Sequence, residues 1–275
     1  MKAILLAAFL LVTFSALTSN AAGLNPDRAS IDGLQFKILS PDGKTTIGYT
    51  RFTVLQNNST EEIKGETRYL DGERDSEDEV LSVAPYTYAL HLKTYEHSFF
   101  NTDGTLQMVD KLDAKSGVAS CASYESGKMK LRRSQLDVPA DSFAGASGLM
   151  MLVGSLRRGT SPLAPLASPS GEGKQTLARN REIKFHAFAC APGPEIFSVK
   201  ALLPDRSDHW SLYPGDLVRL DMRPDLGALN LLIAPFLPTM DAWFNPADNW
   251  SYVGGEFDRY FRGPHVLTVR ISPTD

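Results

Sequence analysis

The sequence has little of several features that would identify a common class of protein. It contains two cysteines, five histidines and three tryptophans among 275 residues. It has no excess of basic side chains, because 32 acidic residues outnumber 28 basic ones and give a formal net charge of −4. A mildly acidic chain has no electrostatic basis for binding nucleic acid, whose phosphates attract lysine and arginine. We therefore expect no nucleic-acid partner.

The chain also lacks the short motifs of several large enzyme classes. It has neither the phosphate-binding Gly-x-x-x-x-Gly-Lys sequence nor a dinucleotide-binding Gly-x-Gly-x-x-Gly after a strand. The Gly-x-Ser-x-Gly elbow of serine hydrolases is absent, since Gly145-Ala146-Ser147-Gly148 breaks that spacing inside a predicted helix. No pair of carboxylates is singled out for glycoside hydrolysis, which depends on separation in space. These patterns predict no catalytic residue and no cofactor.

Potential metal ligands are equally sparse. His91 and His97 share one face of a predicted strand, but six residues of strand separate them by roughly 20 Å, too far for one metal ion. Glu96 points the other way, and we expect both histidines to face outward. The acidic run 71–79 lacks the ligand spacing, central glycine and final glutamate of a calcium-binding loop, so it is expected to be a solvated turn. No metal site is predicted.

A single long apolar run occurs, and it lies at the N-terminus. Residues 1–22 combine Lys2, an apolar stretch and small residues before Gly23. This order is typical of a cleavable secretory signal peptide, whereas an uncleaved anchor helix is the alternative. No cysteine stands at the cleavage region for lipid attachment. We expect a soluble periplasmic or secreted protein whose mature chain, residues 23–275, has no transmembrane segment.

The two cysteines, Cys121 and Cys190, lie in strand-like segments. An exported chain with an even number of cysteines favours a disulfide, which here would close a loop containing the predicted helix. Two buried free thiols are the alternative. Both alternatives remain open from the sequence.

One clear helix is predicted, over residues 141–158. Asp141 or Ser142 is the expected N-cap, and two arginines in the last turn suit the negative end of the helix dipole. The apolar side chains form two neighbouring stripes, Phe143, Ala146, Met150 and Val153 in one and Leu149, Leu152 and Leu156 in the other. A helix that is apolar over so much of its circumference is expected to be buried.

Short alternating segments separated by glycine-containing turns fill most of the remaining chain. They predict one antiparallel meander over 33–137 and a second over 181–273. A Pro/Ser/Gly-rich linker over 160–175 is expected to be mobile, with a flap over the sheet as the alternative. We predict a single mainly β domain. It is a curved antiparallel sheet, or half-open barrel, with one central helix packed on its concave face.

The order of these segments resembles a family of exported, mostly bacterial β proteins of uncharacterised function. The resemblance rests on Val138-Pro139-Ala140-Asp141 leading into a helix that ends Leu156-Arg157-Arg158, and on a late hairpin at Ala242-Trp243-Phe244-Asn245-Pro246-Ala247-Asp248. It implies the half-open barrel with an inserted helix of the periplasmic lipoprotein carriers LolA and LolB. It covers most of the mature chain, but the long linker and the acidic run depart from it. Since the family has no established active site, the resemblance implies no catalytic residue.

The surplus of apolar side chains favours a non-enzymatic binder of an apolar or lipid-like ligand. The candidate ligand-binding residues are Phe143, Leu149, Met150, Val153, His209, Trp210 and Trp243. Each apolar one has the alternative of filling a dry core. Two other functions stay open. One is an envelope scaffold that uses strand edges or apolar patches, and the other is a secreted hydrolase with a close carboxylate pair or a Ser–His contact. His186 is expected to be a hydrogen-bonded strand residue.

Overall fold

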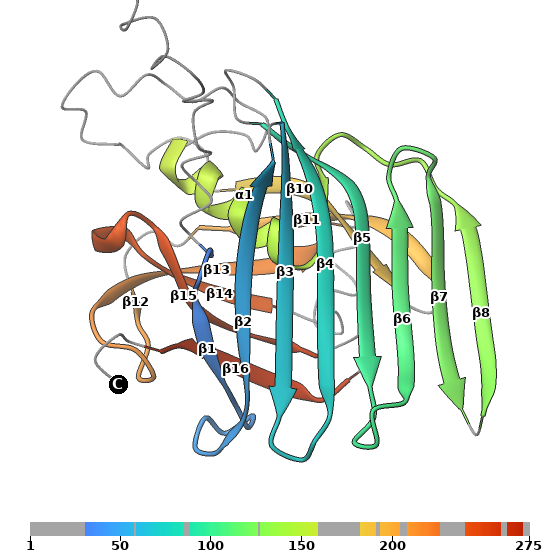
Figure 1. Cartoon of the computed structure of the whole chain (residues 1–275). Coiled ribbons are helices and arrows are strands. Elements are labelled where there is room, and N and C mark those ends of the chain that lie inside the picture. Colours follow the sequence, from blue (N-terminus) through green and yellow to red (C-terminus); the bar gives the residue numbers. More distant parts are fainter. Residues whose placement is uncertain are drawn as a thin grey trace, which may run out of the picture.

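The computed structural model describes residues 31–57, 59–84, 89–125, 127–158, 182–190, 193–203, 208–225, 240–259 and 263–271. The predicted signal peptide and the predicted linker over 160–175 lie outside these residues. The described part of the chain is mainly β and contains a single α-helix (Figure 1), as the alternating sequence pattern predicts. No helix in these ranges is both long and apolar enough to cross a membrane.

The first half of the chain contributes β1 (Gln35–Leu39), β2 (Thr46–Asn57), β3 (Thr60–Tyr69), β4 (Arg74–Val83), β5 (Leu90–Phe100), β6 (Leu106–Asp113), β7 (Val118–Glu125), β8 (Lys128–Gln135), β9 (Ser142–Phe143) and α1 (Gly145–Arg158). The second half contributes β10 (Glu182–Cys190), β11 (Pro194–Leu202), β12 (Asp208–His209), β13 (Asp216–Pro224), β14 (Met240–Asn245), the short 3-10 helix η4 (Pro246–Asp248), β15 (Ser251–Asp258) and β16 (His265–Arg270).

These strands form one continuous sheet. Its order is β8-β7-β6-β5-β4-β3-β2-β1-β16-β15-β14-β13-β11-β10-β9, and β12 pairs with β13 beside it. Neighbours pair antiparallel except β9, which runs parallel to β10. The first and last strands join the two halves, because Phe36 of β1 lies opposite Arg270 of β16.

Tight turns between the strands explain much of this order. In the turn after β5, the Asp103 carboxylate accepts hydrogen bonds from the backbone N–H and the hydroxyl of Thr105. Gly104 follows with a φ of +80°, a conformation that favours glycine. Such short local turns return the chain antiparallel to the preceding strand, as the sequence pattern predicts.

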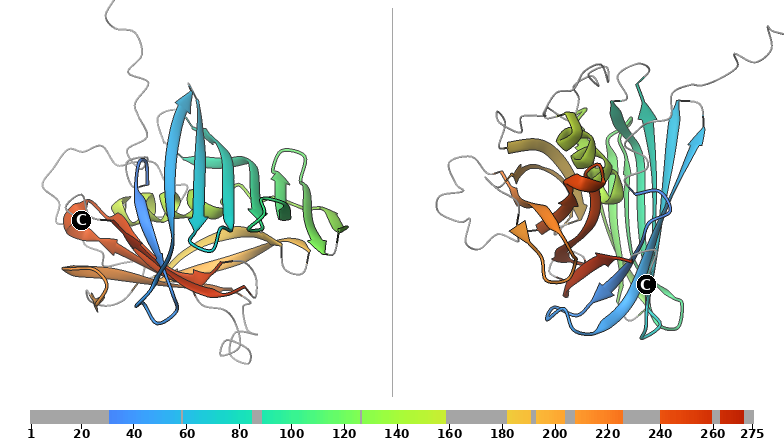
Figure 2. Two further views of the ribbon diagram at one scale, coloured as in Figure 1. Left: turned by 60° about the horizontal axis from the view of Figure 1, so that its bottom comes forward. Right: turned by 90° about the vertical axis from the view of Figure 1, so that its left-hand side faces the viewer.

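The sheet bends until its two halves face each other as layers, with α1 between them (Figure 2). A Cys121–Cys190 disulfide ties β7, beside one edge, to β10, beside the other, across a Cα–Cα distance of 5.7 Å. The disulfide alternative is thus confirmed over two free thiols. The result is a curved, unclosed sheet whose two end regions are held together covalently.

The helix begins at Gly145, four residues later than predicted. The residues expected to cap it, Asp141 and Ser142, have a different role. Ser142 starts β9, while the carbonyl of Asp141 accepts a hydrogen bond from the N–H of His186 at 3.1 Å. Residues that we expected in the first turn of the helix therefore form hydrogen bonds with the sheet instead.

The acidic run is not a solvated turn, contrary to our prediction. Only its first residues turn, and β4 begins at Arg74. Alternation along β4 buries the side chains of Asp75 and Glu79, which are 8% and 0% exposed, and leaves Asp78 exposed. The run is thus an amphipathic strand whose acidic face points into the molecule.

Candidate ligand-binding cavity

A cavity of about 570 Å³ lies inside the curved sheet. Its apolar wall includes Phe36, Phe52, Phe185, Phe197, Leu152 and Val199. These side chains come from strands of both halves of the sheet and from α1, so the cavity exists only because the sheet curls around the helix. Its volume falls within the ordinary range for small-molecule sites.

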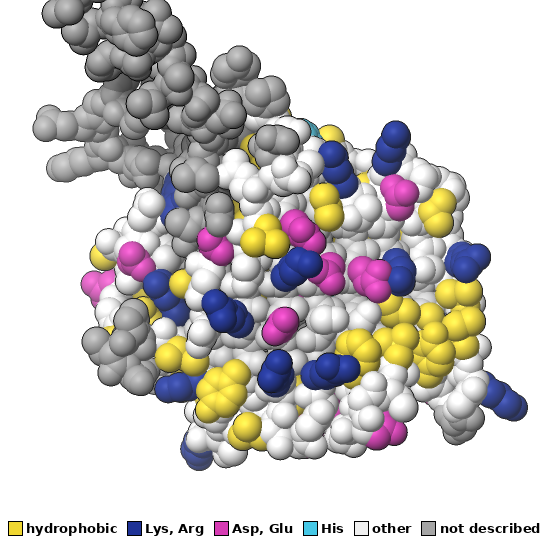
Figure 3. Space-filling model, viewed as in Figure 1, with side chains coloured by type: hydrophobic (Ala, Val, Ile, Leu, Met, Phe, Trp, Pro, Cys, Tyr) yellow, Lys and Arg dark blue, Asp and Glu magenta, His cyan; other side chains and the backbone are white. Residues whose placement is uncertain are grey.

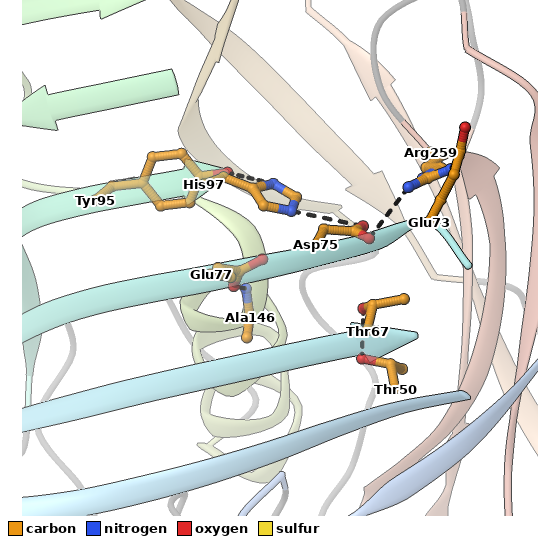
Figure 4. Close-up of polar contacts among 9 residues, drawn as sticks. All are labelled: Thr50, Thr67, Glu73, Asp75, Glu77, Tyr95, His97, Ala146 and Arg259. Carbon is orange, nitrogen blue, oxygen red and sulfur yellow. Dashed lines mark hydrogen bonds and ion pairs between the residues drawn. The ribbon is translucent and has the colours of Figure 1, made fainter. Parts of the chain in front are cut away.

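One wall of the cavity is polar, and its groups form a connected chain (Figure 4). Tyr95 Oη lies 3.2 Å from His97 Nδ1, and His97 Nε2 lies 3.8 Å from Asp75 Oδ2. Arg259 Nη2 lies 3.3 Å from Asp75 Oδ1, and Nη1 pairs with Glu73. Arg259 follows β15, so these ion pairs join the last part of the chain to β4.

His97 faces inward, whereas we predicted that it faces outward with His91. A β-bulge explains the error. Leu81 of β4 pairs with Leu92 while the preceding Val80 pairs with Thr94, which leaves one extra residue in β5. The extra residue reverses the alternation, so His91 and His97 lie on opposite faces. His91 Nδ1 contacts the Ala140 carbonyl oxygen at 3.1 Å instead.

Burial and neighbouring acidic groups shift the pKa of His97 in opposite directions. Burial alone would lower its pKa, but the nearby carboxylates of Asp75, Glu77 and Asp110 outweigh this effect and raise the pKa above its usual value. Burial raises the pKa of Asp110 to about 6, although His97 opposes that shift. Burial, with the neighbouring acids, also raises the pKa of Tyr95. The polar wall therefore favours a protonated histidine and a neutral phenol.

Two acids of β4 cap the helix from outside its own sequence. Glu77 Oε1 accepts a hydrogen bond from the Ala146 N–H at 2.7 Å, and Glu79 Oε1 accepts one from the Ser147 N–H at 2.8 Å. Complete burial and the neighbouring Glu77 raise the pKa of Glu79 well above its ordinary value. Burial thus favours the neutral form of Glu79, while the helix N-terminus favours negative charge on this pair of carboxyl groups.

The structure distributes the sequence-predicted binding residues among four places. Phe143 and Leu149 line the cavity. Met150 and Val153 are fully buried in the core beside it. His209 is exposed on β12. The remaining two, Trp210 and Trp243, stack at 5.2 Å in a separate apolar cluster.

The polar wall was missed by the sequence reading. Asp75, Glu77 and Glu79 recur with the two-residue period of a strand, and this spacing was the available signal. The prediction of a solvated turn over the acidic run does not use this spacing. Nothing in the sequence places Arg259 beside them, because 184 residues separate it from Asp75.

A second polar array lies away from the cavity. Ser198 Oγ is 3.2 Å from His186 Nε2, and His186 Nδ1 is 2.8 Å from Asp141 Oδ1. Side chains alternate between the two faces of the sheet along β10 and β11. Phe185 and Val199 line the cavity, so His186 and Ser198 lie on the face that points away from it. His186 is thus a hydrogen-bonded strand residue, as predicted, in the order of groups that serine hydrolases use.

One group of potential metal ligands occurs in the described ranges. A carboxylate oxygen of Asp110 and the sulfurs of Cys121 and Cys190 lie within 4.8 Å of one another. The two sulfurs are bonded to each other, so neither supplies the thiolate that a metal ion requires.

The outer face of the sheet carries an apolar patch over β6–β8 (Figure 3). Exposed apolar side chains there include Val118, Tyr124, Met129 and Leu131. β8 is also an edge strand. An exposed edge beside apolar side chains is the feature that the scaffold alternative predicts.

Comparison with known proteins gives a structural likeness only. No family model matches the sequence, and no curated protein matches it. A solved β-barrel-like protein of the domain of unknown function DUF1849 from Brucella abortus matches with a TM-score of 0.39 and 9% identity, over 88% of this chain and 97% of that chain. We transfer no function from it. The sequence resemblance to LolA and LolB is not shown by these comparisons.

Proposed function

We propose that the protein binds an apolar or lipid-like ligand in the cavity and is not an enzyme there. The observation that carries this proposal is a cavity of about 570 Å³ with a largely aromatic and aliphatic wall. We further propose that the chain is exported through its N-terminal signal peptide. The Cys121–Cys190 disulfide suits an oxidising compartment.

The energetics of the cavity support an occupant. Apolar side chains that line a water-accessible cavity stay exposed to solvent, and an apolar ligand gains roughly 25 cal/mol for each Å² of that surface that it covers. Water fills a cavity well only where it finds two to four polar partners. Aromatic walls offer few such partners, so an apolar ligand is the better occupant over most of the surface.

The proposal is tested by titrating the refolded, lipid-free protein with the uncharged fluorescent probe N-phenyl-1-naphthylamine. We expect saturable binding of one probe per chain. Leu149→Trp, which adds a ring inside the cavity, is expected to weaken binding at least tenfold. Leu55→Trp is the matched control, because Leu55 is 47% exposed on β2. Absence of saturable binding to the wild type contradicts the proposal, and so does equal binding to both variants.

A second candidate function rests on the Asp141–His186–Ser198 array. Its distances match a nucleophile, a base and an orienting acid, which is the arrangement of a serine hydrolase. We expect labelling by a fluorophosphonate probe if Ser198 is a nucleophile, and loss of the label in Ser198→Ala. His186 and Ser198 lie on two regular strands, β10 and β11, outside the cavity, and a purely structural role predicts no label at all.

A further inference from the structure

We infer that the ligand carries a protonated amine as its polar group, in place of a carboxylate or phosphate. This inference rests on the proposed apolar-ligand function and concerns the polar wall of the same cavity. Five acids line the cavity, and two of them, Glu77 and Glu195, have no basic side chain within ion-pair distance among the described residues, whereas Asp75, Asp241 and Asp258 do. An ammonium group complements that charge, whereas an anion is repelled by it.

The cations of the polar wall are already engaged. Arg259 is 7% exposed and pairs with both Glu73 and Asp75. It also lies over the Tyr69 ring, with 3.7 Å between Cζ and the ring centroid. An anionic ligand would have to displace one of these carboxylates from Arg259, which costs a buried ion pair.

His97 is no better as an anion site. Its Nε2 faces Asp75 and its Nδ1 faces Tyr95 Oη, so both ring nitrogens have partners. The positive charge that this ring gains on protonation is matched by the acids that raise its pKa. Binding an anion here would therefore again break an existing contact.

The helix N-terminus, an ordinary anion site, is also occupied. Its Ala146 and Ser147 N–H groups donate to Glu77 and Glu79. Glu77 lines the cavity, and no basic side chain pairs with it among the described residues. Its second oxygen is the acceptor that an ammonium group in the cavity would use. The fully buried Glu79 lies beside it and shares a side-chain hydrogen bond with Glu77, which raises the pKa of Glu79.

The test compares dodecylamine, dodecanol and dodecanoate as competitors of bound N-phenyl-1-naphthylamine at pH 7, each below its micelle concentration. The three share one chain and differ in head-group charge. We expect the amine to displace the probe at a concentration at least tenfold lower than the acid, with the alcohol between them. Equal or better displacement by dodecanoate overturns the inference but leaves the proposed function standing. Displacement by none of the three counts against the proposed function itself.

The variant Glu77→Gln tests whether Glu77 is the source of the preference for the amine over the acid. Glutamine keeps an oxygen for the Ala146 N–H and removes the charge, so we expect the amine-to-acid ratio to fall to threefold or less. Asp78→Asn is the matched control, since Asp78 is exposed on the opposite face of β4, and its ratio should equal that of the wild type. An unchanged ratio in Glu77→Gln contradicts the assignment. Should that variant not fold, the wild-type ranking decides the inference alone.

Discussion

Three titratable groups in the region of the cavity, one buried and two partly buried, have pKa values shifted in the same direction. The pKa values of Glu79, Asp110 and His97 are all raised in the folded protein. The folded state therefore binds more protons than the unfolded state above about pH 4, and stability falls as pH rises through the raised pKa values. For the carboxyl groups of Glu79 and Asp110, the raised pKa lowers the free energy of unfolding at neutral pH. For His97, the fall in stability is the loss of a stabilising charge as the pH passes its folded pKa.

Asp110→Asn separates the carboxyl penalty from the other effects. The pKa of Asp110 is about 6 against an ordinary 3.8, so ionising it in the fold opposes folding at pH 8. We expect the amide to raise the free energy of unfolding at pH 8 by on the order of 2 kcal/mol. At pH 3.5 we expect little change, because the Asp110 carboxyl group is then mostly protonated in both the folded and the unfolded state. Urea denaturation at the two pH values measures this. A gain of equal size at both pH values would show that the substitution acts through packing.

At the scale of the element, the start of α1 depends on another strand. Gly145 has a φ of +37°, and a Cβ on it would overlap the Glu77 carboxylate. This close approach lets Glu77 reach the Ala146 N–H at 2.7 Å. The helix therefore begins where β4 supplies its acceptors, rather than where its own sequence offers a capping side chain.

Two alanine substitutions in α1 test this arrangement. Gly145→Ala is expected to lower the free energy of unfolding by about 2–3 kcal/mol, because it strains the backbone and displaces Glu77. Gly148→Ala, with open space around its Cβ, is expected to raise it by about 0.5–1 kcal/mol through better helix propensity. Thermal and urea unfolding of both variants give the comparison. Effects of the same sign would contradict the capping role of Glu77.

At the scale of the whole molecule, the disulfide holds a sheet that does not close by hydrogen bonds. It joins strands next to opposite ends of the strand order, over a sequence separation of 69 residues. Other links between distant parts are the Arg259 ion pairs with Glu73 and Asp75. The cavity volume depends on both, since its walls come from both halves of the sheet.

Removing the disulfide is expected to destabilise the protein. For a loop of this length, the chain-entropy estimate is about 4 kcal/mol. Cys121→Ala/Cys190→Ala should therefore unfold at a lower urea concentration than the oxidised wild type and should match the reduced wild type. Probe affinity is expected to fall in the same variant, because the two layers are no longer clamped. A melting temperature that reduction leaves unchanged would show that packing alone holds the ends together.

The local features of this protein follow from its amino-acid sequence alone. Alternating polarity and glycine turns specify antiparallel strands, and the two apolar stripes of α1 specify a buried helix, because these are short-range effects of side-chain period and turn geometry. Leu149 was reachable in this way, since a residue on the apolar face of a lone helix must meet the sheet, whereas Phe143 lines the cavity from β9 and not from the helix.

Which polar residues face the cavity depends on contacts between distant parts of the chain. One bulge in β5 turned His97 inward, a strand in place of a turn buried Asp75, and a contact across 184 residues brought Arg259 to it. A local pattern cannot reveal these outcomes, because the cost of burying a charge is offset by partners that only the curled sheet brings near. The same holds for Trp210 and Trp243, whose apolar character was evident but whose place in a separate cluster followed from the sheet order.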